Sequence, residues 1–224
     1  MIVALDVESQ RAAIALAEQL AGAVSFFKIG LQLYTAAGPE IVRAMAGTGA
    51  KIFLDLKLHD IPATVAKAVA AAGELGVQML TLHLSGGGAM IEAAVAAKAP
   101  HMSLLGVTVL TSSDATTLAE QGVFSTVHDQ VLLLARLGVD RGVDGLITSP
   151  LEVSTLRAEL PPSIELVTPG VRPKWAPPDD QKRFTTPREA IANGADRLVI
   201  GRPITAAADP RSAAERILAE LAGT

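Results

Sequence analysis

One stretch decides the fold: Phe53-Leu54-Asp55-Leu56-Lys57-Leu58-His59-Asp60-Ile61-Pro62. Residues 51–56 have the apolar character of a buried β-strand. Alternate side chains of an extended chain share a face, so Asp55 and Lys57 are predicted to point one way and the intervening leucines the other. Asp60 follows within one turn of chain. Charges at the edge of a core are costly unless they are paired or used. Taken alone, this pattern fits a structural ion pair that closes a strand.

Composition narrows the class of protein. The chain has 224 residues, of which 50% are hydrophobic and 3% aromatic, with a formal net charge of −4 and no cysteine. An aliphatic core suits an α/β protein. The charge argues against nucleic acid as a partner. The lack of cysteine excludes disulfides, zinc–thiolate sites and cysteine nucleophiles. With neither a signal sequence nor an apolar run that could span a bilayer, we expect a cytoplasmic protein without a membrane partner.

Apolar runs alternate with helical patterns along the chain. The predicted strands are 2–6, 24–30, 51–56, 77–83, 103–110, 145–148, 164–168 and 197–200. The predicted helices are 10–20, 39–45, 63–75, 89–97, 129–137, 150–159, 187–193 and a last one that begins at Asp209-Pro210 and ends at 221. Eight strand–helix units predict a single (β/α)8 barrel domain over residues 1–224. The rival is an open doubly wound sheet, but no Gly-x-Gly-x-x-Gly follows the first strand.

Two segments, 112–126 and 172–186, are long for connections within a compact domain. Long loops of this kind are often functional lids. We therefore expect 172–186 to be a lid loop that closes over a ligand.

Polar residues close many of the predicted strands. They are Asp6, Lys28, Asp55, Lys57, His83, Thr111 and Arg202. Thr111 is expected to end the fifth strand, and Arg202 to follow the eighth. The carboxyl ends of barrel strands form one mouth, where the active sites of such barrels lie. Unrelated structural ion pairs would not all choose that end, so Asp55 and Lys57 are predicted to be catalytic.

The histidines give weaker signals. His83 is expected to be a core histidine bonded to backbone, and His59 to orient its loop; His101 and His128 are expected at the surface. His83 beside the carboxylates could suggest a metal site. Lys57 between Asp55 and Asp60 already supplies a cation, so no metal is expected.

The end of the chain is typical of a phosphate site. Thr168-Pro169-Gly170-Val171-Arg172 follows the seventh strand, and Gly201-Arg202 follows the eighth. Barrels commonly bind phosphate with these two loops. Glycine lets backbone N–H groups approach the phosphate, and arginine supplies a planar charge.

Residues 53–65, Phe-Leu-Asp-Leu-Lys-Leu-His-Asp-Ile-Pro-Ala-Thr-Val, closely resemble the signature of the orotidine 5'-monophosphate decarboxylases. The resemblance spans most of the chain. Further matching motifs are Ala4-Leu5-Asp6, Phe27-Lys28-Ile29-Gly30, Thr81-Leu82-His83-Leu84-Ser85-Gly86-Gly87, Val107-Thr108-Val109-Leu110-Thr111-Ser112, Thr168-Pro169-Gly170-Val171-Arg172 and Ile200-Gly201-Arg202-Pro203-Ile204.

The resemblance implies a cofactor-free homodimer that converts orotidine 5'-monophosphate to UMP. Lys28, Asp55, Lys57 and Asp60 match the family's charged network, in which Asp60 reaches in from the partner subunit and Lys57 protonates carbon 6. The substrate contacts implied are Asp6 and the partner's Thr64 at the ribose, Thr111 at the pyrimidine edge, Ile61 near the leaving carboxylate, and Pro169, Gln181, Gly201, Arg202 and Arg172 at the phosphate and lid.

Two other functions remain open. Asp-x-Lys-x-x-Asp is shared with Mg²⁺-dependent decarboxylases and synthases of sugar phosphates that use the same barrel. A nucleotide-binding barrel without activity is the other, although an intact charged network argues against it.

Overall fold

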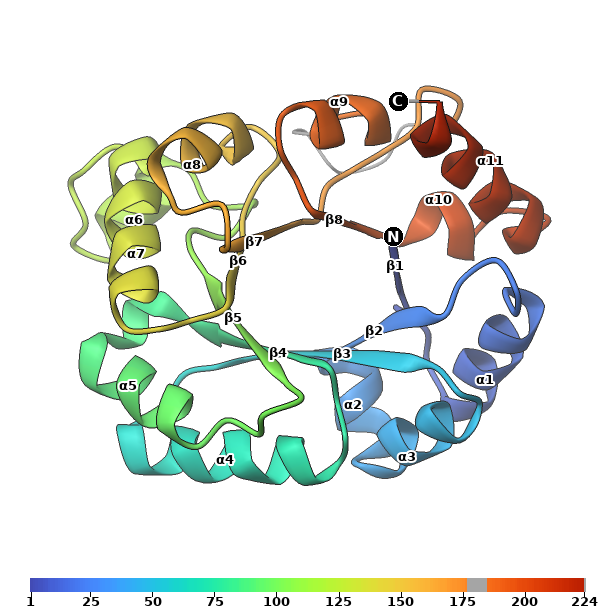
Figure 1. Cartoon of the computed structure of the whole chain (residues 1–224), viewed down its shortest axis with the longest axis horizontal. Helices are drawn as coiled ribbons and strands as arrows, with labels where there is room; N and C mark the ends of the chain where they lie inside the picture. Colours follow the sequence, from blue (N-terminus) through green and yellow to red (C-terminus); the bar gives the residue numbers. More distant parts are fainter. Residues whose placement is uncertain (177–184, 224) are drawn as a thin grey trace.

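Eight parallel strands close into a barrel in the order β1 to β8, and helices surround it (Figure 1). The computed structural model describes residues 1–176 and 185–223. The strands are β1 Ile2–Ala4, β2 Phe26–Gly30, β3 Lys51–Leu58, β4 Met79–His83, β5 Ser103–Val107, β6 Gly145–Ile147, β7 Glu165–Thr168 and β8 Arg197–Ile200. Closure is made by β1 against β8, with Ile2 opposite Val199. The predicted (β/α)8 barrel is confirmed.

The helices of the described residues follow the strands in the expected alternation. They are α1 Gln10–Gln19, α2 Leu31–Ala37, α3 Glu40–Gly47, α4 Pro62–Glu74, the 3₁₀ turn η1 Leu84–Gly86, α5 Gly88–Ala96, α6 Ala115–Glu120, α7 Val127–Asp140, α8 Val153–Glu159, α9 Pro187–Ala192, α10 Arg202–Thr205 and α11 Pro210–Ala222. Among these residues, none of the helices has the length and apolar character needed to cross a membrane.

Two apolar layers hold the barrel together. One lies between strands and helices, where Leu54, Leu80 and Leu82 are buried. The other fills the barrel itself and contains Ile2, Ala4, Phe26, Phe53, Met79, Leu105, Val167 and Val199. Burying a side chain such as Phe53 contributes about 1.5–3 kcal/mol. Because side chains alternate along a strand, the residue two positions beyond an inward-facing residue shares its face, so Asp55 follows Phe53 toward the barrel mouth.

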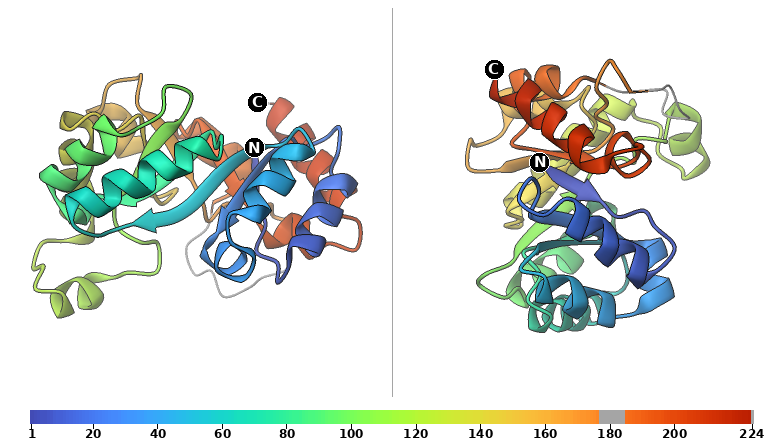
Figure 2. Two further views of the ribbon diagram at one scale, coloured as in Figure 1. Left: turned by 90° about the horizontal axis from the view of Figure 1, so that it is seen from below. Right: turned by 90° about the vertical axis from the view of Figure 1, so that its right-hand side faces the viewer.

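Side-chain caps set where several helices begin. Asp209 accepts a hydrogen bond from the backbone N–H of Ser212, which confirms the predicted start of α11. Thr186 and Glu189 form a reciprocal capping box at α9. Asp114 caps α6 within the segment 112–126, which the sequence analysis treated as a loop. Figure 2 shows this segment projecting away from the barrel.

Three strands end earlier than predicted, and one ends later. β1 stops at Ala4, β5 at Val107 and β6 at Ile147. β5 stops because both of its neighbours stop there: His83 of β4 and Ile147 of β6 are each paired with Val107. Thr111 consequently lies in a turn beyond the strand, and its expected place at the end of the strand is wrong.

β3 runs to Leu58, beyond its predicted end, after a break in its pairing with β4. Arg202 does not continue the eighth strand, because it is the first residue of the short helix α10.

Candidate active site

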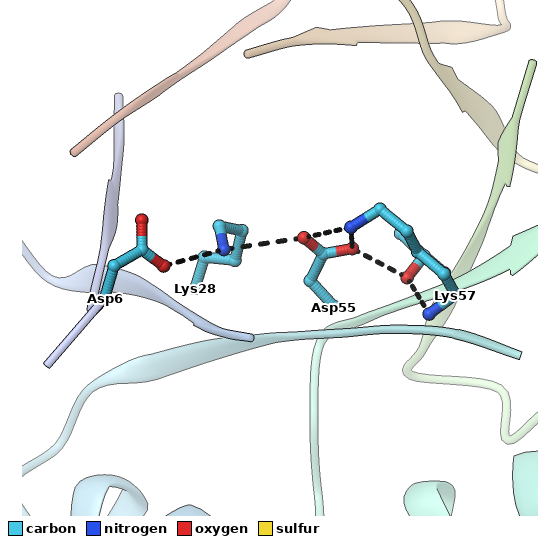
Figure 3. A network of polar contacts seen from close by, with 5 residues as sticks. Asp6, Lys28, Asp55 and Lys57 are labelled. Carbon is cyan, nitrogen blue, oxygen red and sulfur yellow. Dashed lines mark hydrogen bonds and ion pairs between the residues drawn. The ribbon is translucent and has the colours of Figure 1, made fainter. Parts of the chain in front are cut away.

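Four charged side chains form a continuous chain across the barrel mouth (Figure 3). The Lys57 ammonium donates to both oxygens of Asp55, with Nζ 2.8 Å from Oδ1 and 2.9 Å from Oδ2. Lys28 Nζ lies 3.4 Å from Asp55 Oδ2 and 3.4 Å from Asp6 Oδ1. Charges therefore alternate along the row, and each lysine has a carboxylate beside it.

The barrel strands bring these residues together from distant parts of the chain. Lys28 is on β2, Asp55 and Lys57 are on β3, and Asp6 follows β1. Asp55 and Lys57 meet as predicted, but regular alternation is not the cause. The pairing of β3 with β4 shifts between Leu54 and Leu58, and Lys57 has a φ of 50°. A bulge in β3 thus aims the lysine back at the aspartate.

Asp55 is a buried carboxylate that stays ionised. Its side chain is 10% exposed, against 13% for Lys28 and 27% for Lys57. Burial raises the pKa of Asp55, but the charges of Lys28 and Lys57 and the hydrogen bonds from Lys57 and Thr81 together hold that pKa below its usual value. The ionised carboxylate therefore offers both of its oxygens to the Lys57 ammonium.

Thr81 on β4 is a polar site residue that the pattern of charged strand ends does not identify. Its hydroxyl, fully buried, donates to Asp55 Oδ1 at 2.9 Å and accepts from the backbone N–H of Lys57 at 2.9 Å. The signal was present in the strand pattern, because Thr81 interrupts an apolar strand on the inward face of Met79.

A cavity of about 270 Å³ opens above this charged row. Eight of the predicted site residues line it: Asp6, Lys28, Asp55, Lys57, Thr111, Pro169, Gly201 and Arg202. The other lining residues are Ala4, Phe53, Val107, Val109, Leu110, Ile147, Thr148, Gly170, Val171, Val199 and Pro203. One wall is thus charged and the rest is mostly apolar, as in sites that bind a small organic molecule.

Comparison with known proteins places the chain in a family. The family model described as Orotidine 5'-phosphate decarboxylase / HUMPS family matches residues 1–217. The chain belongs to this family. It is 53% identical over 224 residues to an orotidine 5'-phosphate decarboxylase of Opitutus terrae, covering 99% of this chain and 97% of that protein. It is 52% identical over 227 residues to one of Paramagnetospirillum magneticum, covering 98% and 97%.

A solved structure agrees with the fold. The crystal structure of orotidine 5'-phosphate decarboxylase from Lactobacillus acidophilus superposes with a TM-score of 0.87 at 38% identity, covering 98% of this chain and 97% of that one. The closed eight-stranded barrel of this chain is therefore the fold of a solved structure from the same family.

Three predicted residues after β3 do not line the cavity. Asp60, Ile61 and Thr64 are exposed and do not line it. Asp60 Oδ1 accepts from the backbone N–H of Ile61 at 2.6 Å, and within the described residues no lysine or arginine forms an ion pair with it. Gln181 lies outside the described residues.

Arg172 is buried at the start of the segment 172–186. Its backbone N–H donates to the carbonyl of Thr185 at 2.9 Å, and Val171 forms a bridge with Thr185. The two ends of the expected lid are therefore joined to each other, next to the cavity-lining residue Val171. The rest of that segment, 177–184, lies outside the described residues.

His83 differs from the expected core histidine. Its ring is partly exposed, makes no hydrogen bond with the described residues, and lies 5.7 Å from the ring of His59. Burial lowers the pKa of His83, and the charges of His59 and Lys57 lower it further, while Asp55 raises it. Both rings line a second cavity beside β4 and β5. No group of three or more His, Asp or Glu in residues 1–176 and 185–223 could hold a metal ion.

Proposed function

We propose that this enzyme decarboxylates orotidine 5'-phosphate to UMP, in pyrimidine biosynthesis, with Lys57 as the proton donor. The observation that carries the proposal is the Lys57 ammonium, held 2.8 Å from the buried Asp55 carboxylate at the wall of a cavity in a barrel of this family. The names of the curated relatives support the substrate and product.

The chemistry follows from charge. Loss of CO2 from carbon 6 of the pyrimidine leaves a carbanion in the ring plane, with no π-system to delocalise it. Lys57 stabilises the developing charge and then donates its proton to that carbon. Asp55, which also pairs with Lys28, aims the ammonium of Lys57. Asp55 also faces the substrate carboxylate, and that repulsion raises the energy of the bound ground state.

The other cavity residues hold the nucleotide. Asp6 contacts a ribose hydroxyl, and Thr111 the pyrimidine edge. At the other end, Arg202, Gly201 and Pro169 receive the phosphate. The backbone at Gly201 passes close to the site, since a Cβ there would lie 3.5 Å from Asp6 Oδ2. Phosphate binding remote from carbon 6 supplies energy for the chemical step.

The lid takes part in the same binding. We assign the segment 172–186, with Arg172 and Gln181, to closure over the bound phosphate. The joined ends of this segment support the assignment, because they lie beside the cavity. Closing the loop excludes water from the reacting atoms.

The active site is shared between two subunits of a homodimer. Asp60 of the partner subunit completes the charged row, while the partner's Thr64 and Ile61 contact the ribose and the leaving carboxylate. Within one chain these three side chains are exposed and away from the cavity, which supports a role across an interface. Ile61 is 67% exposed, and covering it with a second copy would remove apolar surface from water.

Complementation tests this sharing. Asp60→Ala and Lys57→Ala, each nearly inactive, are mixed and allowed to exchange subunits. Random exchange of equal amounts makes about half of the dimers mixed, and one site in each mixed dimer lacks neither group. Activity should recover to about a quarter of wild type. No recovery, with mass spectrometry showing mixed dimers, would contradict the shared site.

The activity itself is tested by following the ultraviolet loss of orotidine 5'-phosphate with and without EDTA. We expect turnover that EDTA does not change. EDTA-sensitive activity on a keto-sugar phosphate, with none on the nucleotide, would instead assign the Mg²⁺-dependent chemistry. Tight binding of UMP without turnover would indicate a nucleotide-binding barrel.

A further inference from the structure

The bulge in β3 has a single partner residue on the neighbouring strand. Leu54 pairs with Leu80, and Leu58 with Leu82, so four residue steps along β3 face two along β4. Thr81 is the residue of β4 between those two pairs. Opposite it, Lys57 occupies the left-handed region at φ 50°, which a residue with a Cβ rarely adopts. Such a conformation persists where surrounding contacts hold it.

The hydroxyl of Thr81 makes two hydrogen bonds, and both go to the charged pair. It accepts from the backbone N–H of Lys57 and donates to the carboxylate of Asp55, each at 2.9 Å. A threonine hydroxyl has one proton to donate, and an ionised carboxylate has none. The hydroxyl proton therefore goes to Asp55, and the hydroxyl oxygen accepts the N–H of Lys57. The side chain is 0% exposed and does not line the substrate cavity.

We propose that Thr81 is a positioning residue for the decarboxylation: its hydroxyl fixes the bulged backbone of Lys57 and the carboxylate of Asp55 relative to each other. This inference rests on the proposed function. The N–H bond fixes where the Lys57 side chain leaves the strand, and the carboxylate bond fixes the group at which its ammonium points. Thr81 touches no substrate, so it acts through these two residues.

Packing alone does not require a threonine here. Valine has nearly the same shape and would fill the same space in the barrel. It would, however, leave the N–H of Lys57 buried without this acceptor, and Asp55 without one donor. Replacing Thr81 by valine therefore removes the two hydrogen bonds while keeping the packing, so any loss of rate can be assigned to the hydrogen bonds.

The test compares Thr81→Val with Thr81→Ser, which keeps both hydrogen bonds. The matched control is Thr108→Val: Thr108 is a buried threonine on a neighbouring segment, whose hydroxyl donates to the carbonyl of Ile147 at 3.2 Å and which does not line the substrate cavity. Measurements are kcat and KM for orotidine 5'-phosphate, the Kd for UMP, and the midpoint of urea unfolding.

We expect kcat of Thr81→Val to fall about tenfold to hundredfold, from the loss of hydrogen bonds that include a charged partner. KM and the Kd for UMP should stay within about twofold, because Thr81 does not contact the ligand. Thr81→Ser should recover most of the rate. Thr108→Val should keep kcat even where its unfolding midpoint falls.

A pH profile provides a second readout. The Thr81 hydrogen bond is one of the contacts that lower the pKa of Asp55. Its loss should move the acid limb of kcat for Thr81→Val to higher pH, and leave that limb in place for Thr81→Ser. Should the valine variant fail to fold, Thr81→Ala removes the same hydroxyl and should show the same loss of kcat and shift of the limb.

Three results would overturn the inference: unchanged kcat in Thr81→Val, equal rate losses in Thr81→Val and Thr108→Val, or a serine variant as slow as the valine variant. Failure of the wild-type enzyme to decarboxylate orotidine 5'-phosphate would instead overturn the proposed function. The two failures are therefore distinguishable in one set of assays.

Discussion

Asp55→Asn removes the carboxylate that pairs with both lysines of the charged row. It keeps the shape of the side chain and removes its charge. Lys57 Nζ lies 2.8 and 2.9 Å from the two carboxylate oxygens, and Lys28 Nζ lies 3.4 Å from one of them. An asparagine would present an NH2 group to one of these ammonium groups, so a charge-assisted hydrogen bond would be replaced by a contact between two donors.

The size of the effect follows from burial and distance. At an effective dielectric constant of about 20, pairs at these separations attract by about 5–6 kcal/mol. Desolvation of the buried charges offsets much of that attraction. Removing one partner of a buried pair costs about 3–5 kcal/mol. Because the side chain of Lys57 is 27% exposed, water can replace part of what is lost. We therefore expect the free energy of unfolding to fall by about 3 kcal/mol at pH 7.

Urea unfolding at several pH values gives a sharper form of the same prediction. The folded-state pKa of Asp55 lies below 3.8. Its contribution to stability is therefore complete above about pH 4, and is lost as the pH falls through the folded pKa. The difference in unfolding free energy between wild type and Asp55→Asn should be largest near pH 7 and shrink toward pH 3. The same loss of alignment should lower kcat by about 10²–10³-fold.

Two results would refute this reasoning. One is an asparagine variant as stable as wild type at pH 7, with a tenth or more of its kcat. The other is a loss of stability that does not change with pH, which would mean that the shape of the side chain matters and its charge does not.

Two further predictions concern the phosphate and the histidine pair. Arg202→Ala should lower kcat/KM for the nucleotide and barely change turnover of the phosphate-free nucleoside, whereas Arg43→Ala, on the exposed outside of α3, should change neither; equal losses on both substrates would remove Arg202 from the phosphate site. The pKa of His83 is lowered from 6.5 in the folded protein, so the unfolded chain binds a proton at this histidine at a higher pH than the folded protein does. The free energy of unfolding therefore falls as the pH drops below about 6.5. His83→Gln should flatten the fall in unfolding free energy between pH 7.5 and 5.5, and His101→Gln, at an exposed turn, should leave it unchanged.

The fold could be predicted because one sequence pattern, a strand followed by a helix, is repeated along the chain. Each strand is a short apolar run followed by a helical pattern, and β8 begins and ends where predicted. The short helices α2 and α6, of seven and six residues, were not predicted. Strand ends were misplaced where the neighbouring strands, and not the local sequence, decide where pairing stops.

The site was partly predictable for a related reason. Charged residues at strand ends stand out against apolar runs, so Lys28, Asp55 and Lys57 could be identified from sequence. The backbone geometry that joins them could not, because the bulge at Lys57 depends on the register between β3 and β4. Thr81 was overlooked for that reason: its importance lies in what it faces across the sheet.

The most direct test of Lys57 as the proton donor is kcat of Lys57→Ala for orotidine 5'-phosphate, measured beside the Kd for UMP. The substitution removes the ammonium and leaves Asp55 facing an anionic substrate. We expect kcat to fall by more than the roughly 10²–10⁴-fold usual for a general acid, in a folded protein that still binds UMP. A pure, folded variant that retains a tenth of the wild-type rate would contradict the assignment.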